Sequence, residues 1–216
     1  ATLFRSVGVF KLLKGGHCFA PEDIGIKDIL LVYGRICKID NNISAEGLWD
    51  IQTLDCRDRI ICPGFIDQHI HITGGGGEQG PSSRVPELML GEVVTSGVTT
   101  LVGVLGVDDI TRSVSNVLAK AKALEDEGLT TFIYTGSYRI PTATITGNVA
   151  SDLVFIDKVI GVGEIAISDY RSSQHSVEVL KALAADTMIG ALAGGKAGVM
   201  HIHVGNGKEG LLPLFS

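Results

Sequence analysis

After Pro63 the chain alternates short apolar segments, glycine-containing turns and amphipathic segments, and this alternation constrains its fold more than any other feature. We expect strands at 65–72, 98–105, 131–135, 164–168 and 199–204, and helices at 85–96, 112–127 and 177–193. The strand starts recur about every 30 to 36 residues, which is typical of repeated βα units that feed a parallel sheet. The sequence therefore predicts an α/β fold with five such units.

The length of this part of the chain leaves two architectures open. A closed (β/α)8 barrel, of the TIM type, typically takes about 250 residues, and residues 63–216 are too few for that. We therefore expect either an open five-stranded sheet or the first five βα units of a barrel.

The residues before Pro63 follow a different pattern. Short β-branched runs between Phe4 and Ile61 are separated by turn signals such as Gly15-Gly16 and Tyr33-Gly34, and none has the periodicity of a helix. We expect a small β-sandwich-like domain over residues 1–62 and the βα units over residues 63–216.

Composition excludes several classes of protein. Hydrophobic residues make up 45% of the 216 residues and charged residues 19%, which is enough apolar material for a large core. The net charge of −6 makes nucleic acid an unsuitable partner. Four cysteines without a Cys-x-x-Cys pair indicate reduced thiols. With neither a leader-like segment nor an apolar run of about 20 residues, we expect a cytoplasmic protein without membrane contact.

Two histidines near the end of the first expected strand of the α/β part suggest a metal site. His69 and His71 are two residues apart, so both imidazoles point to one face of a strand and can reach one metal ion. The run 74–77 consists of four glycines and is followed by Glu78, so backbone and a carboxylate can approach a ligand. Alternatively, the pair is an ordinary surface or core pair and the glycine run a merely flexible loop.

Two later strands add candidates of the same chemistry. Glu164 opens the fourth expected strand, where a buried carboxylate needs a cationic partner; a solvent-facing glutamate is the alternative. His201 and His203 form a second His-x-His pair at the end of the fifth strand. We expect one of these two histidines to be a ligand.

Taken together, these motifs resemble the metal-dependent amidohydrolase superfamily, and specifically the isoaspartyl (β-aspartyl) dipeptidases. The resemblance rests on the segment from Pro63 to His71, on the glycine loop with Glu78, and on further short segments at 97–99, 135–138, 144–147, 159–162, 166–172 and 194–196. It implies a (β/α)8 metallohydrolase barrel, of which five units are present, with a small N-terminal β domain.

The resemblance also implies roles for individual residues. Two Zn²⁺ ions would be held by His69, His71, Glu164 and His203, with Glu164 bridging them in place of a carboxylated lysine. In the substrate site, Glu78 would hold the ammonium group, Tyr138 would polarise the scissile carbonyl, Arg171 would bind a carboxylate and Gly76 would make a backbone contact. Val107 stands where the family more often has threonine.

The function implied is hydrolysis of the isopeptide bond of small β-aspartyl dipeptides by attack of metal-bound hydroxide, in a protein that is a homo-oligomer when full length. A sixth-strand histidine, a second arginine and the general-base aspartate of the family have no counterpart, so we expect the 216 residues alone to be inactive. A cyclic amidase like hydantoinase or dihydroorotase, and a non-catalytic truncated barrel that serves as a scaffold, remain as alternatives.

Overall fold

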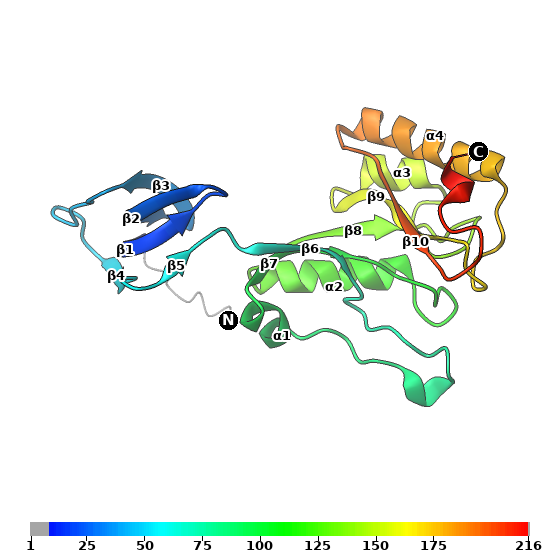
Figure 1. Cartoon of the computed structure of the whole chain (residues 1–216), viewed down its shortest axis with the longest axis horizontal. Coiled ribbons are helices and arrows are strands. Elements are labelled where there is room, and N and C mark those ends of the chain that lie inside the picture. Colours follow the sequence, from blue (N-terminus) through cyan, green and yellow to red (C-terminus); the bar gives the residue numbers. More distant parts are fainter. Residues whose placement is uncertain (1–8, 216) are drawn as a thin grey trace. The chain divides into compact units, whose positions relative to one another are not determined.

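A computed structural model describes residues 9–215 of the chain (Figure 1). The chain divides into two compact units after Pro63. Among the described residues, no helix has the length and apolar character that crossing a membrane requires.

The first unit is a single five-stranded sheet. Strands β3 (Arg35–Asp40), β2 (Asp23–Val32), β1 (Phe10–Phe19) and β4 (Ile51–Asp55) follow one another across it, and β5 (Ile60–Ile61) also pairs with β1. The β-branched runs expected from Phe4 onwards begin outside the described residues. The buried carboxylate of Asp28 accepts hydrogen bonds from Lys14 Nζ and from the amides of Gly15 and Ile43, each at 2.8 Å. These bonds tie the first two strands to the loop after β3.

The prediction of a turn at Gly15-Gly16 is wrong, because both glycines lie inside β1. The pairing of β1 with β2 shifts register between Leu13 and Gly16, so the pair of glycines forms an irregularity within one long strand. A side chain at Gly16 would meet Ile61 Cδ1 at 2.4 Å. Glycine is needed here for close packing rather than for a chain reversal.

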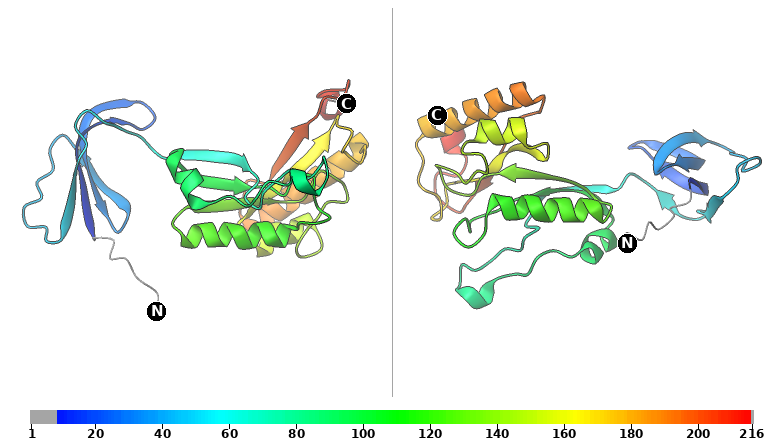
Figure 2. Two further views of the ribbon diagram at one scale, coloured as in Figure 1. Left: turned by 90° about the horizontal axis from the view of Figure 1, so that it is seen from below. Right: turned by 180° about the vertical axis from the view of Figure 1, so that it is seen from behind.

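The second unit contains a parallel sheet of five strands in the order β10-β9-β8-β7-β6. The strands are β6 (Phe65–Ile70), β7 (Val98–Gly103), β8 (Thr130–Thr135), β9 (Val159–Ile167) and β10 (Val199–Val204). The sheet is curled, and helices cover its outer face (Figure 2). Among the described residues, five consecutive strands of a barrel are therefore present, with an α-helix after each of the first four, in line with the first five units that the sequence predicts.

The helices of this unit are α1 (Leu90–Thr95), α2 (Val114–Asp126), α3 (Val149–Phe155) and α4 (Val177–Gly194), with short 3-10 helices η1 (Pro81–Ser83) and η2 (Leu212–Leu214). Leu101, Ile133 and Val162 of the sheet pack with Leu124 and Leu153 of the helices in one buried core. The interior of the curl is lined instead by a smaller cluster that includes Tyr134.

The sequence expectations missed α3 and shortened β9, which begins at Val159 rather than at Glu164. Asp152 of α3 is fully buried, and its carboxylate accepts bonds from the amides of Ile145 and Thr146 and from the Thr135 hydroxyl. This short helix is thus held by a buried polar group, which hydrophobic periodicity does not detect. The expected helix at 85–96 is only six residues long, because the chain before Leu90 is not helical.

Candidate metal and substrate site

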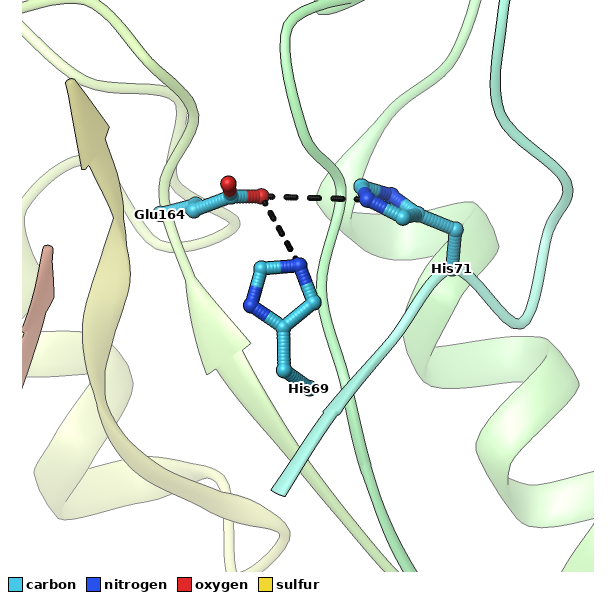
Figure 3. Close-up of side chains that lie close together, drawn as sticks. All are labelled: His69, His71 and Glu164. Atoms are coloured by element: carbon cyan, nitrogen blue, oxygen red, sulfur yellow. Dashed lines mark ion pairs between the residues drawn. The ribbon is translucent and has the colours of Figure 1, made fainter. Parts of the chain in front are cut away.

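The carboxyl ends of the strands bring three of the expected ligands together. His69 lies near the end of β6, His71 directly follows it, and Glu164 lies inside β9 (Figure 3). One ligand atom from each lies within 4.8 Å of the other two. Because all strands of the sheet run parallel, these residues face one end of the sheet although 93 residues separate His71 from Glu164.

Glu164 is the centre of this group and is almost completely buried, with 1% of its side chain exposed. Its Oε2 atom lies 3.4 Å from His69 Nε2 and 3.8 Å from His71 Nε2. Oε2 has no hydrogen-bond partner among the described residues. A buried carboxylate oxygen without a partner is costly, and a cation among these three side chains would supply one. The residues therefore fit a metal ion.

The protonation of His71 favours the same chemistry. Burial lowers the pKa of His71, with His69 adding to the effect and the charge of Glu164 opposing it. The neutral imidazole keeps a lone pair for a metal ion. A side chain at Gly106 would meet the His71 ring at 2.5 Å, so the absence of a side chain there makes room for the ring.

His203 lies on the other side of Glu164. Its Nδ1 atom is 2.8 Å from Glu164 Oε1 and 3.0 Å from the Tyr138 hydroxyl, and its Nε2 atom is 3.0 Å from Asp169 Oδ2. The two oxygens of Glu164 thus face different histidines, Oε1 towards His203 and Oε2 towards His69 and His71. Burial and then the charge of Glu164 raise the pKa of Tyr138, so its phenol stays protonated and can donate a hydrogen bond.

Arg171 links this group to the glycine loop. Its guanidinium forms ion pairs with Asp169 at 2.8 Å and with Glu78 at 2.9 Å, and lies 5.1 Å from the centre of the Tyr138 ring. The hydrogen bond from Arg171 holds the pKa of Asp169 well below its usual range. The two residues expected to bind opposite charges of a substrate are therefore paired with each other.

A cavity of about 70 Å³ adjoins these residues and is lined in part by His71, Gly76, Glu78, Val107 and Tyr138. The structure thus brings all the residues of the expected metal and substrate site into one region.

Two residues of this region, Asp169 and Arg112, were not predicted from the sequence, and His201 was predicted only as one of two possible ligands. Asp169 bonds both Arg171 and His203, and His201 Nε2 lies 2.7 Å from His69 Nδ1. Arg112 Nη2 donates to the Gly75 carbonyl at 3.1 Å and so anchors the glycine loop. The sequence signals for Asp169 and His201 are the Asp-x-Arg spacing at 169–171 and the His-x-His pair at 201–203.

The chain is similar to several known proteins, although no protein-family model matches it. The crystal structure of D-hydantoinase covers 92% of the chain with a TM-score of 0.60 at 17% identity, a similarity of fold. Dihydroorotase of Aquifex aeolicus is 29% identical over 179 residues, and the match covers 38% of that protein. The chain thus shares the fold of D-hydantoinase and is similar in sequence to a dihydroorotase, as the resemblance drawn from the sequence implies.

Among particular proteins, the chain is similar to β-aspartyl dipeptidase. The crystal structure of this enzyme from Fervidobacterium islandicum AW-1 matches 95% of the chain at 50% identity with a TM-score of 0.92. A second structure of that enzyme, in complex with the β-Asp-Leu dipeptide, matches 96% at 49% identity with a TM-score of 0.90. The chain spans about half the length of these dipeptidase chains, 56% and 54%.

Proposed function

We propose that the chain forms part of a binuclear zinc hydrolase that cleaves the isopeptide bond of β-aspartyl dipeptides. The observation that carries the proposal is the buried Glu164, whose two oxygens face His203 on one side and His69 with His71 on the other. An anionic group with histidines on two sides would suit two cations that share it. The similarity to β-aspartyl dipeptidase supports the same reaction.

In this proposal His69 and His71 would hold one Zn²⁺, His203 would contribute to holding the second, and Glu164 would be common to both. When bound, two divalent cations would supply an activated water at neutral pH and polarisation of the scissile carbonyl. Tyr138 donates its phenolic proton in a hydrogen bond to the carbonyl oxygen, where negative charge develops during the reaction.

Glu78 and Arg171 determine which substrate fits. A β-aspartyl dipeptide carries an ammonium group and carboxylates, so it can exchange the ion pair between these two side chains for one contact with each of them. Gly76 lines the same cavity and offers its backbone to the substrate. We therefore assign the ammonium to Glu78 and a carboxylate to Arg171.

A cyclic amide is the competing substrate, since dihydroorotases and hydantoinases share the fold. Neither a dihydropyrimidine nor a hydantoin ring has an ammonium group, and binding one would leave Glu78 without its cation. A zwitterionic dipeptide uses both charges of the site, so we favour it.

Binding measurements test the proposal on the chain as it is. Metal analysis after dialysis against Zn²⁺ should give two ions per chain, and Glu164→Gln should reduce that number. In calorimetry the zinc-loaded chain should bind β-Asp-Leu but neither α-Asp-Leu nor dihydroorotate. A chain that holds no zinc would support the scaffold alternative, and preference for dihydroorotate would support a cyclic amidase.

The role of Glu78 has its own test. Glu78→Gln removes a charge-assisted hydrogen bond worth about 1.5–3 kcal/mol, so the affinity for β-Asp-Leu should fall by roughly 10- to 100-fold. The exposed Glu127 at the end of α2 provides the control, because Glu127→Gln makes the same chemical change away from the site. Equal affinity of Glu78→Gln and the unaltered chain contradicts the assignment.

A further inference from the structure

His201 occupies a built position beside the candidate metal site. Its Nε2 atom lies 2.7 Å from Nδ1 of His69, and the two ring centres are 4.9 Å apart. On another side its ring stacks on buried Tyr134, with ring centres 5.0 Å apart and planes within 12°. A side chain at Gly163, next to Glu164, would lie 2.7 Å from His201 Cβ. The imidazole is therefore held between a tyrosine ring and a strand that leaves room for it.

The contact matters because the two nitrogens of His69 face different groups. Nε2 faces Glu164 Oε2 at 3.4 Å, whereas Nδ1 faces His201. A neutral imidazole carries one proton, so a lone pair on Nε2 requires the proton to be on Nδ1. That proton needs an acceptor, and Nε2 of His201 lies at hydrogen-bond distance.

We propose that His201 is a positioning residue that accepts the Nδ1–H of His69 and so aims the Nε2 lone pair of His69 at the cation site. Histidine ligands of metals ordinarily donate their second N–H to a carboxylate, a carbonyl or water. Here the imidazole of His201, on β10, accepts this hydrogen bond instead, and its own proton is on Nδ1. The inference rests on the proposed cation site at His69, His71 and Glu164.

The tautomers can be observed directly in the unaltered, zinc-loaded chain. With ¹⁵N-labelled imidazoles, NMR should show His69 protonated at Nδ1, His201 protonated at Nδ1, and a coupling across the hydrogen bond between His69 Nδ1 and His201 Nε2. Protonation of His201 at Nε2 in the zinc-loaded chain would overturn the proposal. This measurement needs no variant that could fail to fold.

Cation affinity gives a second readout that does not depend on activity. In titrations with Co²⁺, followed by its visible absorption, His201→Leu should weaken binding by about 10- to 100-fold. His201→Gln should restore affinity to within about threefold, because the glutamine amide oxygen can accept the same proton. His17→Leu in the first unit, where the ring bonds Asp23 on the surface, is the matched control and should bind like the unaltered chain.

The outcomes separate the two hypotheses. If the unaltered chain binds no Co²⁺, the proposed metal site is wrong, and the role of His201 falls with it. If the unaltered chain and His201→Leu bind Co²⁺ equally, the metal site stands and only the positioning role is refuted.

Discussion

Among changes of a single atom, replacing one carboxylate oxygen of Asp169 by an amide nitrogen should disturb the candidate site most. Asp169 follows β9 and is buried, with 4% of the residue exposed. Oδ1 accepts from the Arg171 amide at 2.8 Å and from Arg171 Nε at 3.0 Å. Oδ2 accepts from Arg171 Nη2 at 2.8 Å and lies 3.0 Å from His203 Nε2. Both oxygens are therefore occupied by donors.

Asp169→Asn keeps the shape but replaces one oxygen by an NH₂ group. In either orientation of the asparagine amide, its NH₂ group faces the two N–H donors that bonded the oxygen it replaces. Two charge-assisted hydrogen bonds are therefore lost. Each is worth about 1.5–3 kcal/mol. Arg171 and His203 are each 25% exposed, so water can replace part of the loss and the lower value applies. We expect a loss of about 3 kcal/mol in unfolding free energy.

Urea unfolding followed by circular dichroism measures this loss, and calorimetry with β-Asp-Leu measures its effect on the site. In thermal unfolding, a loss of about 3 kcal/mol in unfolding free energy corresponds to a melting temperature lower by roughly 6–12 °C in a unit of this size. Dipeptide affinity should fall by about tenfold or more, because the guanidinium of Arg171 loses the anchor that orients it.

Asp152→Asn is the matched control. Asp152 is equally buried and accepts several hydrogen bonds on both oxygens, but none of them comes from the site. It should lower stability by a similar amount and leave dipeptide affinity unchanged below the unfolding transition. If Asp169→Asn were as stable as the unaltered chain, or if both variants lost affinity equally, the reasoning on Asp169 would be refuted.

Three further variants test other parts of the structure. Burial opposes ionisation of Asp28, but hydrogen bonds from Lys14 and two amides outweigh burial and lower the pKa of its carboxyl. The first unit should therefore lose stability as the pH falls below about 4. In Asp28→Asn the urea concentration at the midpoint of unfolding should depend less on pH. Gly190→Ala places a methyl group 2.5 Å from the α3 backbone and should cost about 1–3 kcal/mol in unfolding free energy, whereas Gly91→Ala, with open space in α1, should not lower the melting temperature. Arg112→Met releases the glycine loop and should weaken β-Asp-Leu binding in calorimetry without changing zinc content.

The sequence by itself determined the features that depend on neighbouring residues. The period of strands and helices after Pro63 predicts the βα units, since each unit must bury one apolar face. Two histidines two residues apart at a strand end face one side, because side chains alternate along a strand. For the same reason, the second His-x-His pair marks both His201 and His203 as candidates before any contact is known.

Only the tertiary structure decided which of these residues meet. Glu164 lies inside β9 rather than at its start, and the curl of the sheet places it between His203 and the first pair of histidines. The ion pair of Glu78 with Arg171 joins residues 93 positions apart. Such contacts depend on the pairing of distant strands and on the cost of leaving buried polar groups unpaired. A local pattern carries no information on either, and for that reason the contacts made by Asp152, Asp169 and His201 became visible only in the fold.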